Sequence, residues 1–191
     1  MLRTIFIIIA VLVVGVAGLL LYATMTQPDT FRIQRAMTIN APADKIFTIV
    51  TDLRRGAEWS PYEQKDPNMK KGFNGPASGP GSQMTWDGNS DIGAGALTIA
   101  NATAPSKVVL NLDMTRPMSA HHVIEYDLTP DGSGTKMTWS MHGQMNLVSK
   151  VVCLFMNMDK MVGGDFEKGL AALKSVAESA GQNQSRTSAL P

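Results

Sequence analysis

The longest hydrophobic run in the chain lies near its beginning and contains no charged residue from Ile5 to Ala23. A helix of this length spans roughly 28 Å, close to the ~30 Å of hydrocarbon in a bilayer. The pattern predicts an N-terminal transmembrane helix, with an anchor over residues 1–25 and membrane contact through residues 5–23. The alternative is a cleaved signal peptide, which usually has a shorter apolar stretch ending at a small-x-small site. The sequence after Leu21, YATMTQ, has no clean site of that kind, which favours the anchor.

The charges that flank this helix predict its orientation. Arg3 precedes it, and no basic residue follows until Arg32. Because basic residues next to a membrane helix tend to stay in the cytoplasm, we expect a single-pass protein with a cytoplasmic N-terminus. The folded domain then lies outside the cytoplasm, in the periplasm if the cell is bacterial. A polar spacer over residues 26–30 is expected to hold the domain close to the membrane.

Hydrophobic and polar positions alternate over residues 31–39, which is the period of a half-buried strand. Helix-start signals follow at Asn40 and Pro42, and short helical segments continue through Tyr62. Gly, Pro, Asn and Lys dominate residues 66–81, which predicts a loop. Further strands are predicted over residues 82–87, 94–102, 107–115, 120–128 and 135–145.

The period changes to 3.6 residues after Asn146, where one apolar stripe predicts a long C-terminal helix. Gly163 and Gly164 interrupt the stripe, so we expect a kink or a break there, with Asp165 capping a restarted turn. Residues 180–191 are polar and without pattern, which predicts a disordered tail. The order of elements predicts an α+β fold over residues 31–179, in which a curved antiparallel sheet wraps around the last helix.

Net charge and cysteine content exclude several classes of protein. Lys and Arg number 17 and Asp and Glu 16, and removing the anchor removes only Arg3, so the domain is neutral. A nucleic-acid partner is therefore not expected, because binding phosphates requires a basic surface. The single cysteine, Cys153, excludes an internal disulfide framework. Adjacent strand residues such as His121 and His122 point to opposite faces, so no metal and no cofactor are expected.

Large polarizable side chains recur on the predicted apolar sheet face and in the segment before it. Such side chains are typical of a pocket for an irregular apolar guest, although singly they are more often ordinary core residues. The ligand-binding set predicted on this ground is Trp59, Tyr62, Met84, Trp86, Ile124, Tyr126, Met137, Trp139 and Met141.

Two residues are weak candidates for acid–base chemistry. Glu58 adjoins Trp59 near the expected pocket mouth, where burial would raise the pKa of its carboxyl group. His122 shares a strand face with Tyr126 and would be a general base inside the pocket. The alternatives are a solvated loop carboxylate and a histidine at a strand end.

Several segments of the chain resemble the START-like, or SRPBCC, superfamily, in its polyketide cyclase/dehydrase-like branch. They are RAMTINAPADKIFTIVTDL, EWSPYEQKDP, GSQMTWDGNSDIGAGALTI, GTKMTWSMHG and DFEKGLAALK, in this order along the chain. The resemblance implies a helix-grip domain with a deep apolar pocket between the sheet and the last helix. It implies no single activity, because members include lipid and hormone carriers as well as cyclases and dehydratases.

These observations favour a membrane-tethered protein that binds a hydrophobic or amphipathic small molecule, such as a lipid, in the pocket. One alternative is a cyclase-, dehydratase- or hydrolase-like enzyme that uses a pocket carboxylate or His122. The other is a scaffold whose pocket is filled by its own side chains. The sequence leaves the oligomeric state open.

Overall fold

The computed structural model describes residues 2–187, of which residues 180–187 are described by their backbone alone. The tail predicted for residues 180–191 lies outside the fully described residues. The helical segments are α1 (Leu2–Thr26), α2 (Ala43–Thr51), the 3₁₀ turn η1 (Leu53–Arg55), α3 (Gly56–Trp59), α4 (Pro61–Lys65), α5 (Leu147–Phe155) and α6 (Met158–Thr187). The strands are β1 (Thr30–Ile39), β2 (Lys70–Asn74), β3 (Gln83–Asp87), β4 (Ala94–Thr103), β5 (Lys107–Arg116), β6 (Ala120–Asp131) and β7 (Gly134–Gln144).

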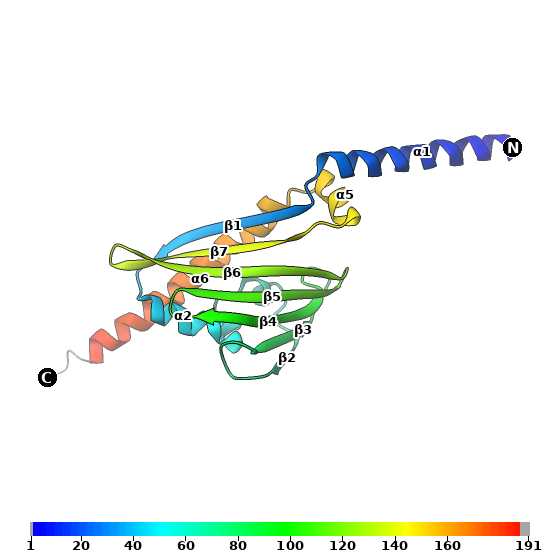
Figure 1. Ribbon diagram of the computed structural model, residues 1–191. Helices are drawn as coiled ribbons and strands as arrows, with labels where there is room; N and C mark the ends of the chain where they lie inside the picture. Colours follow the sequence, from blue (N-terminus) through cyan, green and yellow to red (C-terminus); the bar gives the residue numbers. More distant parts are fainter. Residues whose placement is uncertain (1, 188–191) are drawn as a thin grey trace.

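The seven strands form one antiparallel sheet in the order β1-β7-β6-β5-β4-β3-β2. Only the β1–β7 pair joins strands far apart in sequence, and it begins with Thr30 opposite Gln144. The other strands follow one another as neighbours (Figure 1). The strand register places the C-terminal end of α1 and the N-terminal end of α5 at the same end of the sheet, which we call the α1 end.

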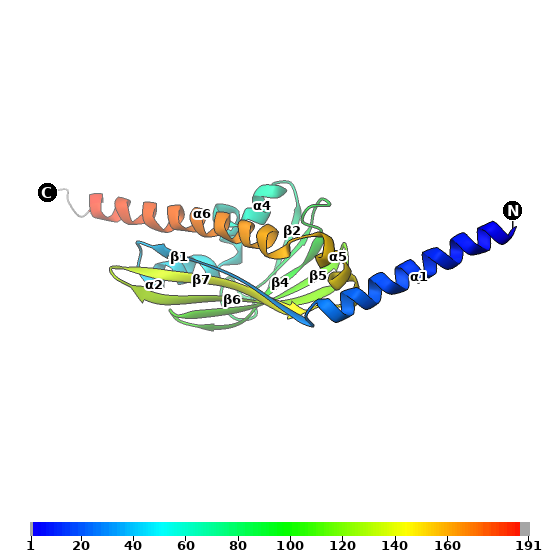
Figure 2. The ribbon, with the colours of Figure 1, turned by 90° about the horizontal axis from the view of Figure 1, so that it is seen from above.

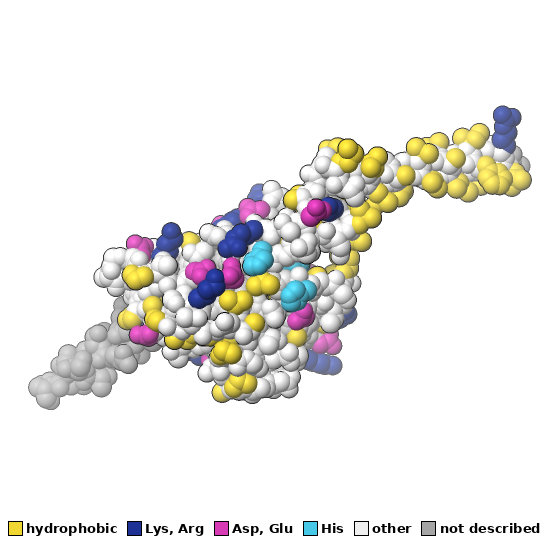
Figure 3. Space-filling model, viewed as in Figure 1, with side chains coloured by type: hydrophobic (Ala, Val, Ile, Leu, Met, Phe, Trp, Pro, Cys, Tyr) yellow, Lys and Arg dark blue, Asp and Glu magenta, His cyan; other side chains and the backbone are white. Residues whose placement is uncertain are grey.

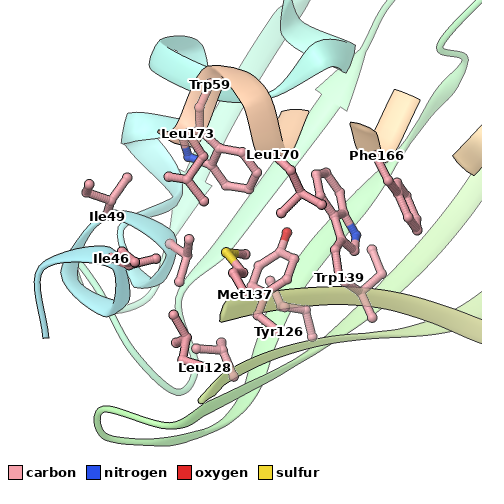
Figure 4. Close-up of a cluster of buried hydrophobic side chains, with 14 of the residues drawn as sticks. Ile46, Ile49, Trp59, Tyr126, Leu128, Met137, Trp139, Phe166, Leu170 and Leu173 are labelled. Atoms are coloured by element: carbon pink, nitrogen blue, oxygen red, sulfur yellow. The ribbon is translucent and has the colours of Figure 1, made fainter. Parts of the chain in front are cut away.

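Helix α6 lies across one face of the sheet, while α1 projects away from the folded domain (Figure 2). Phe166, Leu170, Leu173 and Ala177 of α6 are almost completely buried, at the three- and four-residue spacing of a helix face. They pack on buried sheet residues such as Tyr126 (Figure 4). Each large side chain buried there stabilises the fold by about 1.5–3 kcal/mol. The predicted α+β helix-grip architecture is therefore confirmed.

Strand β2 corrects the prediction of a loop over residues 66–81. Its sequence, KKGFN, has no apolar alternation, and its burial is intermediate at best. Pairing with β3 along the sheet edge, from Lys70 opposite Asp87 to Asn74 opposite Gln83, makes it a strand. A polar edge strand of this kind is stabilised by its neighbour's backbone rather than by its own side chains.

The break between the C-terminal helices lies at Met156 and Asn157 and not at Gly163 and Gly164, as predicted from the sequence. The side chain of Asn157 accepts a hydrogen bond of 2.9 Å from the backbone N–H of Lys160, which caps the start of α6. Helix α6 then continues through both glycines without interruption.

Helix α1 is long and apolar enough to cross a membrane, by length and composition, as a membrane span or a signal sequence. Its side chains are exposed along almost the whole helix. Leu20 is half-buried and Ala23 is completely buried, because α5 packs against the last turns of α1.

Candidate functional site

A cavity of about 330 Å³ lies between the sheet and α6. Strands β3 to β7 supply one wall, and the segments η1 to α4 and the first turns of α6 supply the other. Its volume falls within the ~300–1,000 Å³ range of small-molecule sites. The scaffold alternative requires a pocket filled by the protein's own side chains, and this cavity does not fit that requirement.

Aromatic rings close the inner end of the cavity. Trp139 makes edge-to-face contacts with Trp59 and Tyr126, with ring centroids 5.5 and 5.4 Å apart. On its other side Trp139 stacks on Phe166 of α6 at 4.3 Å (Figure 4). Such contacts fix ring orientation beyond what burial alone achieves, so this end is a rigid apolar wall.

The inner end also contains hydrogen-bond donors without acceptors. The indole N–H groups of Trp59 and Trp139 are buried and have no partner among the described residues. Burial raises the pKa of the phenol groups of Tyr62 and Tyr126 above their ordinary value, so both stay protonated at neutral pH. Because a phenol O–H donates as well as accepts, the cavity suits a guest that carries an acceptor oxygen.

The buried carboxylates on the cavity wall are held in ion pairs. Lys65 Nζ lies 2.5 Å from Asp165 Oδ2, and the same amine lies 5.4 Å from the centre of the Tyr62 ring. Glu63, only 7% exposed, is held by an ion pair with Lys71. Of the other lining carboxylates, Asp52 accepts a hydrogen bond from the backbone N–H of Arg54, and Asp91 is exposed at the mouth.

The mouth of the cavity is marked by the lining residues that remain exposed, namely Lys65, Asp91 and Met161. His122 lines the cavity toward the α1 end, where its ring stands edge-on to Phe31 at 5.1 Å. Burial of the ring, and secondarily the neighbouring His121, lowers the pKa of His122, so its imidazole is neutral at pH 7.

Most residues of the predicted ligand-binding set lie on the cavity wall. Those that do are Trp59, Tyr62, Met84, Trp86, Ile124, Tyr126, Trp139 and Met141. Met137 is the exception and does not line the cavity. It shares the strand face of Trp139 but lies farther from the α1 end, where α2 and Leu173 cover it completely (Figure 4).

Glu58 also departs from its expected role. It is not part of the cavity lining, and its two oxygens accept hydrogen bonds of 2.7 and 2.6 Å from the guanidinium of Arg55. This ion pair holds the pKa of the carboxyl group below its usual value, whereas the sequence argument expected burial to raise it. Glu58 therefore acts as a local partner of Arg55 at the surface.

Several lining residues were not predicted. Leu110, Leu112 and Met114 share one strand face, so the period of β5 was a signal for the cavity residues Leu112 and Met114. No sequence period indicated Glu63 or Asp165, because their ion-pair partners Lys71 and Lys65 come close only in the folded protein. The described residues contain no cluster of His, Cys, Asp or Glu that could hold a metal ion.

The family described as polyketide cyclase/dehydrase and lipid transport matches residues 30–178. Among solved structures, the protein CV1439 from Chromobacterium violaceum is similar with a TM-score of 0.55 and 13% identity, covering 79% of this chain and 99% of that one. An uncharacterized protein from Rhizobium leguminosarum has a TM-score of 0.57 and 12% identity over 78% of this chain and 95% of its own.

The di-domain ARO/CYC protein StfQ, from the steffimycin biosynthetic pathway, has a TM-score of 0.58 and 10% identity, covering 80% of this chain and 52% of StfQ. The present chain therefore spans about half the length of that two-domain relative. No curated protein matches the chain. At these identities the solved structures support the fold alone, and the match over residues 30–178 carries the family.

Proposed function

Because the chain belongs to the polyketide cyclase/dehydrase and lipid transport family, we propose that it binds a hydrophobic or amphipathic small molecule in the cavity and is tethered to a membrane by α1. The observation that carries the proposal is the 330 Å³ cavity with a predominantly apolar wall and a closed aromatic end. Removing the ligand's apolar surface from water would drive binding, at about 25 cal/mol per Å² before ordering costs.

The polar groups of the cavity narrow the class of ligand. Lys65 and Glu63 already have charged partners, so a charged ligand group that binds either of them would have to compete with existing ion pairs. Tyr62 and Tyr126 retain protonated phenol groups. We therefore expect an uncharged headgroup with an acceptor oxygen, such as an ester, ketone or hydroxyl, attached to an apolar body.

The tether follows from the length and apolar character of α1, whose described side chains are exposed rather than packed on the domain. An exposed apolar helix of this length is unfavourable in water and stable in hydrocarbon. This feature supports a membrane span. The alternative is that α1 is a signal sequence and is removed, and the mass of the mature protein distinguishes the two.

The test is native mass spectrometry of the full chain purified from membranes, followed by extraction and identification of any retained guest. The matched variant is Leu112→Trp, which adds volume at a half-buried cavity position between Leu97 and His122. The control is Thr129→Trp, which places the same side chain at an exposed position of β6.

We expect the native chain and the Thr129→Trp variant to retain an apolar guest that Leu112→Trp lacks. Added guest should also raise the melting temperature of the first two proteins, because a ligand that binds only the folded state stabilises it. A native chain that retains no guest and whose melting temperature no apolar compound shifts would contradict the proposal.

A further inference from the structure

Exposed large hydrophobic side chains outside α1 are concentrated in one part of the described structure. Five of them lie in and around α5, and the sixth, Met118, lies in the turn between β5 and β6. The side chain of Phe155 is 75% exposed and that of Val148 is 51% exposed. This surface, which we call the α5 patch, consists of Met118, Leu147, Val148, Phe155, Met156 and Met161.

The α5 patch lies at the α1 end of the sheet. Strand β5 ends and β6 begins there, with Met114 opposite Ala120, so Met118 belongs to this end. Helix α5 follows β7 at the same end and packs on the last turns of α1. Figure 3 shows hydrophobic side chains continuing from α1 onto the adjoining surface of the domain. The patch is thus continuous with the apolar helix proposed as the tether.

Polar contacts hold α5 in this place. Asn146 accepts a hydrogen bond of 2.8 Å from the backbone N–H of Ser149 and caps the helix. Lys150 Nζ lies 2.5 Å from Asp29 Oδ1, in the spacer that follows α1, and the Lys150 side chain is only 10% exposed. These contacts help to fix α5 beside α1, while Leu147, Val148 and Phe155 remain exposed.

One residue links the patch to the cavity. Met161, at the start of α6, is 46% exposed and also lines the cavity at its mouth. Met161 thus places one exposed apolar side chain of the patch at the mouth, where Lys65 and Asp91 are also exposed. A ligand leaving the mouth beside Met161 would meet an apolar side chain of the patch.

We propose that the α5 patch docks into the lipid bilayer that α1 crosses, with the cavity mouth at Met161 turned toward the hydrocarbon. This inference rests on the proposed tether, because α1 fixes the distance between the patch and the membrane. The apolar face of an amphipathic helix that lies on a membrane is buried at the boundary between headgroups and acyl chains. Docking gives an apolar ligand a path between membrane and cavity that avoids water.

The test measures the depth of nitroxide labels in the full chain, reconstituted into vesicles of phosphatidylethanolamine and phosphatidylglycerol. Single cysteines are introduced at Val148, Phe155 and Met161 in a Cys153→Ser background. Val14→Cys reports on the middle of α1, and Ser133→Cys reports on the exposed turn at the opposite end of the sheet. Accessibility to oxygen and to a water-soluble nickel chelate is compared at each position.

We expect the labels at Val148, Phe155 and Met161 to lose accessibility to the nickel chelate and gain accessibility to oxygen, as the label at Val14 does. The label at Ser133 should remain accessible to the chelate. If Val14 is buried in the bilayer while either α5 label, or the Met161 label, stays in water, docking in this orientation is refuted and the tether stands. If Val14 itself stays in water, the tether proposal fails, and docking through it fails too.

Discussion

Gly169 of α6 lies directly against the indole of Trp139, so that a methyl group at Gly169 would come within 2.7 Å of Cζ3 of the ring and 3.0 Å of Cδ of Pro61. A side chain at this position would force α6 away from both. The absence of a side chain at Gly169 therefore sets how closely the helix approaches the sheet, and so the width of the inner cavity.

The Gly169→Ala variant should be less stable than the native protein by about 1–2 kcal/mol. Overpacking against two rigid rings costs about 1–3 kcal/mol, and the gain in helix propensity returns at most about 1 kcal/mol. Gly164→Ala is the matched control on the same helix, because nothing lies within 4 Å of its added methyl group. Chemical denaturation should show that Gly164→Ala is as stable as the native protein or more so. Equal destabilisation by both variants would contradict the packing argument.

The Tyr126→Phe variant should weaken binding of a guest with an acceptor oxygen while leaving the aromatic wall intact. A neutral hydrogen bond contributes about 0.5–1.5 kcal/mol, so affinity for the ketone probe prodan should fall about two- to tenfold. Binding of N-phenyl-1-naphthylamine, which has no carbonyl group, should not change. Fluorescence titrations in nanodiscs measure both, with Leu112→Trp as the blank for lipid partitioning and Tyr22→Phe in α1 as the control. Equal losses for both probes would indicate altered packing instead of a lost hydrogen bond.

The fold was predictable from the sequence where hydrophobic period and burial agree. The alternation of Met137, Trp139 and Met141 and the stripe through Phe166 and Leu170 fixed the two packed faces, and both are buried as expected. Strand β2 was missed because the sheet edge, and not its own side chains, determines its conformation. The helix break was misplaced because a glycine is compatible with a helix where a neighbouring group packs closely against it, as the guanidinium of Arg35 does at Gly163.

The candidate site was predictable only on its apolar side. The strand period brought Trp86, Ile124 and Trp139 to one face. Whether Met137 on the same face is covered depends on where α2 packs. The partners of the buried charges could not be predicted from the sequence, because Asp165 pairs with Lys65, which is remote in sequence. Such long-range pairs are set by the complete fold and leave no local pattern.

Removing the amine of Lys71 should destabilise the protein, because Glu63 is left buried without its partner. We expect Lys71→Met to cost about 2 kcal/mol, less than the ~3–5 kcal/mol of a fully buried pair, since the Lys71 side chain is 27% exposed. The double variant Lys71→Met/Glu63→Leu should recover most of this loss, because it buries no charge. Urea denaturation of the native protein, Lys71→Met, Glu63→Leu and the double variant gives the four unfolding free energies of a double-mutant cycle. A double variant that is no more stable than Lys71→Met would exclude this explanation.

Acidification should destabilise the protein through His122. Burial holds the pKa of its imidazole below the ordinary value of 6.5, so as the pH falls below about 6.5 the unfolded chain takes up a proton that the folded protein resists. His122→Gln should remove the part of the loss in unfolding free energy that His122 causes between about pH 7.5 and pH 5. Identical pH profiles for the native and His122→Gln proteins, measured by denaturation in the same buffers, would rule out the assignment.

Membrane sidedness should follow from the positive charge at the start of α1. Arg3 and the amino terminus are expected to stay in the cytoplasm, which places the β6–β7 turn outside it. In bacterial cells with a permeabilised outer membrane, a cysteine at Ser133, in the Cys153→Ser background, should react with a maleimide that cannot cross membranes. The intact mass of the membrane-bound protein should include α1, because no clean cleavage site follows Ala23. Reaction only after lysis would reverse the orientation, and a soluble product lacking α1 would identify it as a signal sequence. The soluble product would also change the role of the cavity, because a domain that left the membrane would have to carry its ligand through water.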